Sequence, residues 1–375
     1  IETLRKTAIL AKDFEGTNLS ELNAQIEESF SGCVQTEFED DGLVDLYKLA
    51  YERAEQNGTE GPQFTIKSPW TTFNNAFTGF RPKDSYCIAG RPSHGKSGVL
   101  LGLSYQCANT IKENWVDGKP LPVLYLDTEM EEGEQADRMA ACIADINPDL
   151  IESGDWRKNK ECVERVRGVL KDTSLMSNFS FKFVPRLSAM QIRSIFRKWM
   201  RQKVGPDGYG LVVFDYLKLS GDELGTTDNT SLAIGQKLDI LKDEVKETSN
   251  CVFIFGCQRN RSGEDDDSSI AESDYVQRLS TWVGLIKKKS VDEKVEEPVE
   301  HFGTHKLIPI KFRKLGKDGW TFENPVKINK KYLPNWINLS WDNFRFTDKG
   351  DGRVIQDYLN LEKGNRKLDK DNNVP

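Results

Sequence analysis

The sequence contains few of the residues that build metal centres and disulfide frameworks. Its 375 residues include 3 histidines and 7 cysteines, and no two cysteines have the C-x-x-C spacing. The cysteines are scattered, at Cys33, Cys87, Cys107, Cys142, Cys162, Cys251 and Cys257. This distribution argues against a zinc site and a disulfide scaffold and favours a reducing, cytoplasmic compartment. His301 and His305 lie in an acidic, proline-broken stretch, so we expect them to be solvated.

The chain also lacks long apolar runs and an excess of positive charge. No stretch approaches the ~18 apolar residues of a membrane span, and no signal peptide is visible, so we expect no membrane association. With 52 Lys and Arg against 59 Asp and Glu, the net charge is −7. A broad basic surface is therefore excluded, and any nucleic-acid contact must be local, as in the lining of a channel. The chain begins with Ile1 rather than Met, which is compatible with a fragment that has lost an N-terminal domain.

Between residues 64 and 350, apolar strand-like runs alternate with longer helical segments, which is typical of a mostly parallel α/β sheet flanked by helices. The expected strands are Ser85–Ala89, Val123–Asp127, Phe179–Val184, Leu211–Asp215, Val252–Gly256, Trp282–Ile286 and Leu307–Phe312. The expected helices are Ser97–Asn114, Glu132–Ala144, Lys160–Lys171, Ala189–Lys203 and Ser231–Thr248. We interpret residues 64–350 as one domain.

The flanks of this domain are more polar. Residues 1–63 form a helical or linker segment in which Leu43–Arg53 has an apolar stripe at helical spacing. That helix either covers the core or docks on a neighbouring subunit. The acidic stretch 289–303 is expected to be a loop. Residues 351–375 are interpreted as a polar tail. This tail contains a short helix at Val354–Leu361 and is expected to be mobile from Lys363 onward.

One motif dominates the chain. The run Gly90-Arg91-Pro92-Ser93-His94-Gly95-Lys96-Ser97 has the spacing of a phosphate-binding loop, with a strand before it and a helix after it. Its backbone N–H groups and the helix N-terminus favour phosphate, Lys96 reaches the β- and γ-phosphates, and the Ser97 hydroxyl ligates Mg²⁺. The alternative is a glycine-rich turn that matches by chance, which the strand–loop–helix context disfavours.

Two buried strands end in acidic residues. Ligands of open α/β sheets bind at the carboxyl ends of the strands, so Glu129 is a candidate to orient and deprotonate an attacking water. A helix-capping role is the alternative for Glu129, and Asp127 and Glu131 compete with it on chemistry alone. Asp215 ends an apolar run downstream of the phosphate loop, as in a Walker-B strand, and would help hold Mg²⁺.

A third strand ends in Gln258. Its amide could sense the γ-phosphate through a hydrogen bond, although a strand-end polar residue without a role is the alternative.

Together these motifs resemble those of the DnaB-type replicative helicases, whose ATPase domain has a RecA-like fold. The resemblance covers roughly residues 64–348. Its motifs are the phosphate loop, Glu129-Met130 followed by Gln135 and Arg138, Asp215-Tyr216-Leu217-x-Leu219, Gln258-x-Asn260-Arg261 and Lys311-x-Arg313. All of them occur in the order that the family has.

The resemblance implies a role for each matched residue. Glu129 is the catalytic base, Asp215 coordinates the metal, and Gln258 couples the γ-phosphate to a DNA-facing loop. Lys311 and Arg313 act in trans on the ATP of the adjacent subunit, where an inserted guanidinium is worth ~10³–10⁵ in rate. Without the resemblance, residues 306–314 would be interpreted as an edge strand whose charged residues prevent it from pairing with another chain.

The family implies a hexameric ring that threads single-stranded DNA, with a primase or helicase loader as a further partner. Loops 221–229 and 259–269 would face the channel, with Lys218, Arg259 and Arg261 as the cations for phosphate contact. Two departures weaken these DNA assignments: residues 264–267 are acidic, and Lys218 stands where the family usually has Gln. Residues 1–63 do not match the family's helical N-terminal domain, which suggests its removal or a compact phage version.

The sequence therefore predicts an ATP- and Mg²⁺-dependent DNA helicase motor, in a bacterial cytoplasm or, for a phage protein, that of the host. Two alternatives remain: a RecA- or KaiC-like ATPase without unwinding, and a module that uses nucleotide only to hold an assembly together. The set of Lys96, Glu129 and Arg313 argues against the assembly module. Such a module has no use for a catalytic base or for an arginine finger, that is, an arginine that reaches the ATP of an adjacent subunit.

Overall fold

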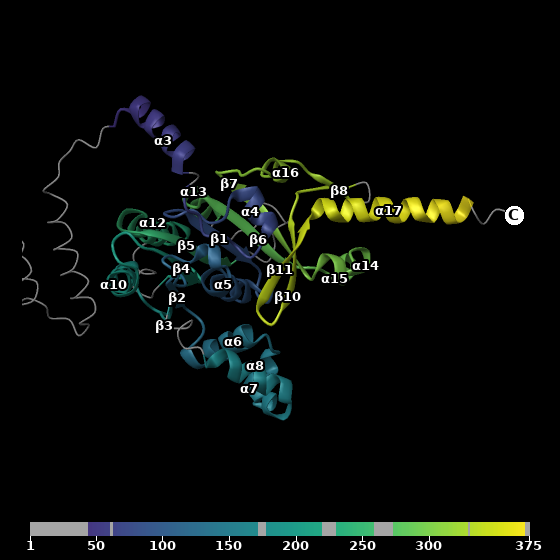
Figure 1. Cartoon of the computed structure of the whole chain (residues 1–375), viewed down its shortest axis with the longest axis horizontal. Coiled ribbons are helices and arrows are strands. Elements are labelled where there is room, and N and C mark those ends of the chain that lie inside the picture. The colour runs from purple at the N-terminus through teal and green to yellow at the C-terminus, as the bar shows by residue number, and fades with distance from the viewer. Residues whose placement is uncertain are drawn as a thin grey trace, which may run out of the picture.

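A nine-stranded sheet, in the order β11-β10-β7-β6-β1-β5-β4-β2-β3, forms the centre of the molecule (Figure 1). The structure is a computed structural model, and it describes residues 44–60, 63–171, 178–219, 230–258, 273–328 and 331–371. None of the helices in these segments combines the length and apolar character needed to cross a bilayer. The mixed α/β architecture agrees with the fold class that the sequence predicts.

Six neighbouring strands of the sheet are parallel, and the sequence predicts all of them. They are β1 (Ser85–Gly90), β2 (Val123–Asp127), β3 (Phe179–Phe183), β4 (Tyr209–Asp215), β5 (Asn250–Gln258) and β6 (Trp282–Lys288). Every residue of β1 and β2 is buried. Such continuous burial explains their nearly uninterrupted apolar sequences, because helices cover both faces of a parallel sheet.

The remaining strands run antiparallel to their neighbours, and the sequence predicts only the first of them. β7 (His305–Phe312) pairs with β6, β10 (Ile337–Asp342) with β7, and β11 (Arg345–Asp351) with β10. β8 (Val326–Ile328) and β9 (Lys331–Leu333) form a separate two-stranded ribbon. β10 and β11 were missed because polar residues interrupt their alternation. β7 lies between β6 and β10, so it is not an edge strand.

Helices pack on both faces of the sheet. On one face lie α10 (Ala189–Trp199) and α12 (Thr230–Thr248), which contribute Phe196 and Leu238 to a core shared with Phe214 of β4. On the other lie α4 (Thr71–Phe77) and α5 (Lys96–Tyr105), whose Leu100 packs in the core that contains Val213. The change of face between neighbouring residues 213 and 214 is the two-residue period of a strand. The site is therefore carried on a rigid, doubly covered sheet.

A group of helices projects from the sheet after β2 (Figure 1). It comprises α6 (Glu132–Ala144), α7 (Pro148–Ser153), the short 3₁₀ turn Asp155–Lys158 and α8 (Lys160–Leu170). Its own small core contains Ala144, Ile146 and Val166 and is separate from the two cores of the sheet. We call this group, residues 132–171, the helical excursion.

Several predicted boundaries are wrong. The helix expected over Ser97–Asn114 is divided into α5, a π-helical turn at Gln106–Thr110 and a 3₁₀ turn at Lys112–Asn114. Similarly, a π-helical turn, Met200–Val204, follows α10. The expected polar tail is helical, because α17 runs from Gly352 to Asp371. Finally, α13 (Ser273–Leu279) and α16 (Trp320–Glu323) were not predicted.

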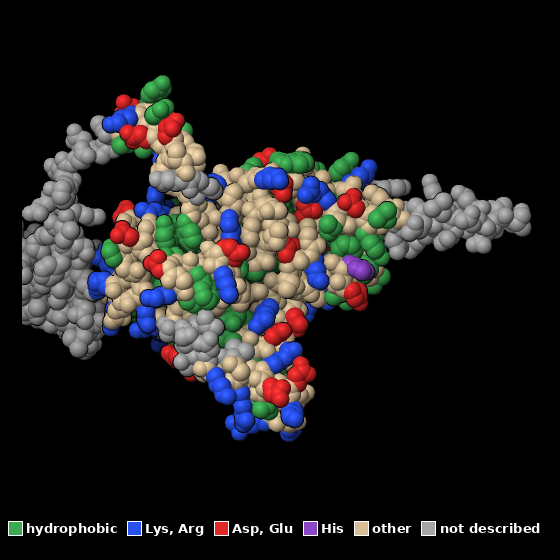
Figure 2. Space-filling model, in the orientation of Figure 1, with side chains coloured by type: hydrophobic (Ala, Val, Ile, Leu, Met, Phe, Trp, Pro, Cys, Tyr) green, Lys and Arg blue, Asp and Glu red, His purple; other side chains and the backbone are tan. Residues whose placement is uncertain are grey.

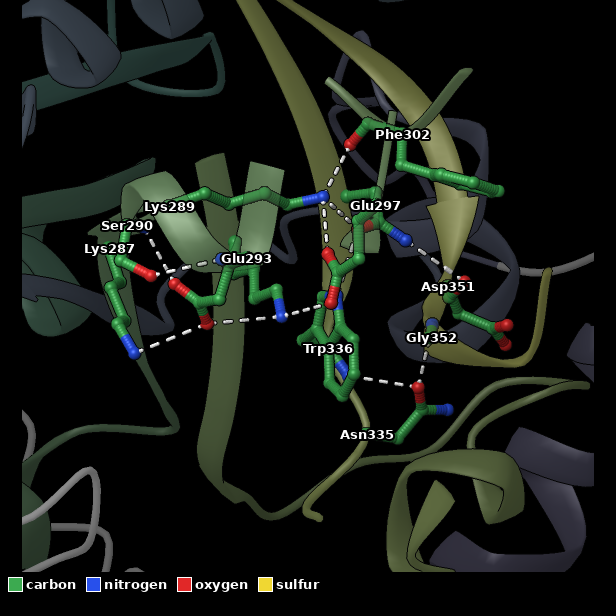
Figure 3. A network of polar contacts seen from close by, with 12 residues as sticks. Lys287, Lys289, Ser290, Glu293, Glu297, Phe302, Asn335, Trp336, Asp351 and Gly352 are labelled. Carbon is green, nitrogen blue, oxygen red and sulfur yellow. Dashed lines mark hydrogen bonds and ion pairs between the residues drawn. The ribbon is translucent and has the colours of Figure 1, made fainter. Parts of the chain in front are cut away.

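The stretch 289–303 is not a loop but contains α14 (Val291–Glu296) and α15 (Val299–Phe302). A capping box explains the start of α14: the Ser290 hydroxyl accepts from the Glu293 amide, and the Glu293 side chain returns to the Ser290 amide. Two of the acidic residues that suggested a solvated loop, Glu293 and Glu297, instead face buried lysines (Figure 3). Helix α3 (Leu46–Glu60), by contrast, covers no core formed by the described residues, because Leu46, Tyr47 and Tyr51 are exposed.

The buried charge network joins α14 to the sheet. Glu297 lies 2.7 Å from the ammonium groups of both Lys289 and Lys306, and the three side chains are almost completely buried. Lys289 also donates to the Phe302 carbonyl at 2.9 Å and to Asn338 Oδ1 at 3.1 Å. Burial nevertheless lowers the pKa of Lys289 from its usual value. The two buried ammonium groups and the Glu297 carboxylate are therefore stable in the core only together.

Removing the shared carboxylate tests this dependence. We expect Glu297→Ala to lower the free energy of unfolding by about 3–5 kcal/mol, because the two buried lysines would lose the carboxylate that they share. The matched control is Glu52→Ala on exposed α3, which breaks a solvent-exposed pair with Lys48 and should cost less than about 1 kcal/mol. Urea unfolding measures both variants, and equal losses would contradict the role given to the network.

Candidate active site

The phosphate loop, residues 90–97, connects the end of β1 to the start of α5, as predicted. Its turn requires left-handed backbone at two positions, Ser93 (φ 65°) and Gly95 (φ 84°), of which the second is the N-cap of α5. Lys96 is the first residue of the helix and is buried, with its ammonium 3.8 Å from the centroid of the Tyr216 ring. The loop thus ends in a helix N-terminus, which favours a phosphate ligand.

The strand pairing brings the other predicted residues to the same edge of the sheet. Gly90 pairs with Gln258 of β5, and Asp127 of β2 pairs with Asp215 of β4. Because these strands are parallel and adjacent, their carboxyl ends meet beside the phosphate loop. Glu129 lies two residues beyond the end of β2 and is exposed, as is Gln258.

Asp215 has the environment expected of a metal ligand. It is buried, its Oδ2 accepts from the Tyr125 hydroxyl at 3.1 Å, and its Oδ1 is buried without a hydrogen-bond partner among the described residues. Burial raises the pKa of Asp215, while the Lys96 ammonium and the Ser97 side chain act in the opposite direction. The buried Oδ1 of Asp215 and the nearby Ser97 hydroxyl are both oxygen ligands, and they fit a divalent cation bound by oxygen atoms.

Asp127 shapes the turn that carries Glu129. Its Oδ1 accepts from the backbone N–H groups of Glu129 at 2.8 Å and Met130 at 3.0 Å. Burial, followed by the charge of the neighbouring Asp215, raises the pKa of Asp127 to about 6. These bonds give Asp127 a structural role, which weakens it as a rival base.

The capping alternatives for the other acids also find little support. α6 begins at Glu132, and its N-cap is Glu131, whose side chain makes no capping hydrogen bond. Glu129 lies before this cap and is exposed. Its side chain is therefore available at the carboxyl end of the sheet, the same end that carries the phosphate loop.

Lys311 and Arg313 lie far from the phosphate loop of their own chain. β7 runs antiparallel to β6, so His305 pairs with Lys288 at the phosphate-loop edge and Phe312 pairs with Trp282 at the opposite edge. The length of β7 separates the two edges by roughly 20 Å. Arg313 donates to the Arg278 carbonyl. Burial, followed by the charge of Arg313, lowers the pKa of Lys311 to about 8.

The expected DNA-contacting residues are only partly described. Lys218 is exposed shortly after β4. Arg259, Arg261 and the two loops 221–229 and 259–269 lie outside the described residues.

One histidine departs from its predicted environment, and the surroundings of the loop were not predicted. His301 is exposed, as expected, but His305 is buried at the start of β7 and packs against Phe346. A Cβ on Gly95 would lie 3.4 Å from both His305 Nε2 and Phe346 Cζ. The aromatic residues around Asn343 were the available signal, since they alternate across a turn residue as hairpins do.

The strand order and the phosphate loop between β1 and α5 define a RecA-like α/β fold. Residues 65–320 match the family described as "DnaB-like helicase C terminal domain". The chain therefore belongs to the DnaB-like helicase C-terminal domain family.

Named relatives agree with this assignment. A "Probable replicative DNA helicase" from Trieres chinensis is 26% identical over 276 residues, which cover 72% of this chain and 57% of the relative. A "Replicative DNA helicase DnaB" from Buchnera aphidicola is 27% identical over 249 residues, covering 65% and 50%. The chain thus spans about half the length of these curated relatives.

Two solved structures share the fold. One, described as an ATPase domain, aligns with a TM-score of 0.61 at 19% identity, and the alignment covers 82% of this chain and 99% of that one. The other, "The Structure Of A DnaB-Like Replicative Helicase And Its Interactions With Primase", aligns with a TM-score of 0.62 at 18% identity, covering 92% and 76%. At these identities the likeness concerns the fold.

The carboxylate pair can be tested through stability. Because the pKa of Asp127 is raised in the folded state, ionisation costs stability as pH rises from the ordinary carboxyl range to about 6. In metal-free buffer at about pH 7.5, we expect Asp127→Asn to raise the free energy of unfolding by about 1–3 kcal/mol. The amide oxygen can still accept the two backbone N–H groups.

The control is the same variant at about pH 4.5, where Asp127 is protonated in the folded protein and the gain should largely disappear. Thermal or urea unfolding at both pH values measures the difference. A gain that does not depend on pH would show that charge repulsion is not its cause.

Proposed function

We propose that this chain is the motor domain of a replicative-type DNA helicase, hydrolysing Mg²⁺-ATP between subunits and moving along single-stranded DNA to unwind duplex. One observation carries the proposal: in a member of this family, the phosphate loop, Glu129, Asp215 and Gln258 meet at one edge of the sheet. A chain that only bound nucleotide would not need an acid beside the phosphates.

In this proposal, the phosphate loop binds the β- and γ-phosphates and Lys96 neutralises their charge. Ser97 and Asp215 hold Mg²⁺, which supplies charge stabilisation at the transferring phosphoryl group. Glu129 orients the attacking water and accepts its proton, and Gln258 contacts the γ-phosphate. The hydrogen bonds from the Asp127 turn support this role, because they hold the backbone of Glu129 in place.

Lys311 and Arg313 are proposed to complete the site of an adjacent subunit. They lie at the opposite edge of the sheet from their own phosphate loop, too far to act in cis. In a ring, the same edge of one subunit can face the phosphate loop of the next, which gives a heterologous, closing interface. Such a finger would stabilise the charge that develops on the γ-phosphate.

Helix α3 supports an assembly independently of the finger. Its apolar side chains, including Leu46, Tyr47 and Tyr51, are exposed. Figure 2 shows apolar side chains among charged ones at the place where Figure 1 draws α3. Since they cover no core in the part of the chain that the structure describes, we propose that α3 docks on a neighbouring subunit. A homo-oligomer, hexameric as in the family that the chain resembles, is proposed from both features.

The proposed nucleic-acid partner is single-stranded DNA inside the ring. Lys218 is exposed shortly after Asp215 and is proposed to contact phosphates, together with Arg259 and Arg261. Confinement of these cations to a channel accommodates the net charge of −7. A primase is a further proposed partner, because one structural neighbour is a DnaB-like replicative helicase described with its interactions with primase. A helicase loader is another.

The first experiment measures ATPase activity and unwinding of a forked duplex across protein concentration, with and without single-stranded DNA. We expect DNA-stimulated turnover that appears above an assembly threshold. Glu129→Gln should bind ATP but turn it over ~10²–10⁴-fold more slowly, because it lacks the base. Lys96→Ala should instead lose nucleotide binding.

Each outcome separates the candidate functions. ATP turnover that ignores both DNA and concentration would favour a KaiC-like ATPase, and nucleotide binding without turnover would favour an assembly module. Near-normal turnover by Glu129→Gln would assign the base to another residue.

Mixed assemblies test whether Arg313 acts in trans. When Arg313→Ala is mixed with unaltered protein, we expect ATPase activity to fall more steeply than the mole fraction of the variant, because each altered subunit disables its neighbour's site. The matched control is Lys317→Ala, an exposed residue shortly beyond β7. A linear decrease for both variants would argue against a shared site.

A further inference from the structure

The tip of the β10–β11 hairpin, residues Asn343–Arg345, lies between two helices that begin at the proposed site. α5 begins at Lys96 of the phosphate loop, and α6 begins at Glu132, shortly after Glu129. In Figure 1 the hairpin reaches past α5 towards the helical excursion. None of the roles described so far explains why the tip occupies this position.

The tip approaches α5 through two glycines on one face of the helix. A Cβ on Gly102 would overlap the Phe344 carbonyl oxygen, and one on Gly98 would lie 3.2 Å from the Phe344 ring. The turn itself is tight, with Asn343 at φ 46° and Phe344 at φ 64°. Only glycines allow backbone to come this close to a helix, so the contact is a specific one.

The same tip holds the C-terminal end of α6. Arg345 donates from Nε to the Cys142 carbonyl at 2.7 Å and from Nη2 to the Ile143 carbonyl at 2.8 Å. Asn343 Nδ2 donates to Asp145 Oδ1 at 3.0 Å. A guanidinium at this position satisfies carbonyls that have no partner within the helix and complements the negative end of the helix dipole.

Within the described residues, α6 makes further contacts of its own: Gln135 is buried, and the Arg138 guanidinium lies 5.6 Å from the centroid of the Phe344 ring. The small core of the excursion is its own, and within α6 it is Met139 that packs against the sheet core shared with α5. The helix α6 is therefore held along its length by Gln135, Arg138 and Met139, and Arg345 holds its C-terminal end. Glu129 lies just before the N-terminal end of the same helix.

We propose that Arg345 is a positioning residue, which holds α6 against α5 so that Glu129 keeps its place relative to Lys96 and Ser97. The inference rests on the proposed function, in which Glu129 orients the attacking water. Because the reacting groups need near-attack geometry, a displacement of about 1 Å at Glu129 can cost ~10²-fold in rate.

The kinetic test uses Arg345→Ala, Arg345→Lys and the control Arg167→Ala, which removes an exposed arginine from α8 of the same excursion. For Arg345→Ala we expect kcat for ATP to fall ~10–100-fold while KM and nucleotide affinity change less than about threefold, since the phosphate loop is intact. Arg345→Lys should recover part of the loss, and Arg167→Ala should match the unaltered protein.

A double variant distinguishes positioning from general damage. If Arg345 acts through Glu129, adding Arg345→Ala to Glu129→Gln should cause little further loss of turnover, because residues that act as a unit are non-additive. An equal additional loss in the Glu129→Gln background, or a fall in nucleotide affinity as large as that in kcat, would overturn the proposal.

Amide hydrogen exchange provides a readout that does not depend on catalysis. Arg345→Ala should increase exchange in residues 132–145, with the sheet strands unchanged, whereas unchanged exchange in α6 would overturn the proposal. If Glu129 proved not to be the base, the exchange result would still stand, so the two failures are distinguishable. Should Arg345→Ala fail to fold, Asn343→Gly removes the Asp145 contact, tolerates the left-handed backbone at φ 46° and is measured in the same way.

Discussion

The parallel pairing of β1, β5, β4 and β2 is the constraint on which the site depends. Main-chain hydrogen bonds fix the register, so Gly90 lies beside Gln258 and Asp127 beside Asp215. Residues that are up to 168 positions apart in the chain thereby reach one edge (258 − 90). Helices on both faces keep this edge rigid. Because the alternating apolar side chains must be buried beneath them, a shift of one residue in the pairing of a strand would turn every side chain to the wrong face of the sheet.

The same edge places charge where solvent cannot reach it. Asp215 has a buried oxygen that no described residue satisfies, and the pKa of Asp127 is raised to about 6 by burial and then by Asp215. Both features store unfavourable energy in the metal-free protein, and a divalent cation would relieve it. Near the start of β7, by contrast, the buried Glu297 carboxylate is paired with the ammonium groups of Lys289 and Lys306. These ion pairs attach α14 to the sheet and do not form a binding site.

Much of this was predictable, because it depends on local patterns. Strands β1 to β6 are short apolar runs between helical segments, and the phosphate loop has a fixed spacing with a glycine at the φ 84° position. The failures have physical causes. Acidic residues at 293 and 297 suggested solvent, but lysines from β6 and β7 neutralise them. His305 was assigned to solvent because nothing nearby in the sequence indicates Phe346, which packs against it.

The sequence by itself determined the class of fold and the chemistry of the loop, since both are written in contiguous residues whose spacing follows from backbone geometry. The tertiary structure alone decided which distant residues become neighbours. Strand pairing places Asp127 beside Asp215, and it places Lys311 and Arg313 at the end of the sheet opposite their own phosphate loop. The hairpin likewise brings Arg345 to the C-terminal end of α6. These relations join residues from distant segments, and no local pattern encodes the contact between them.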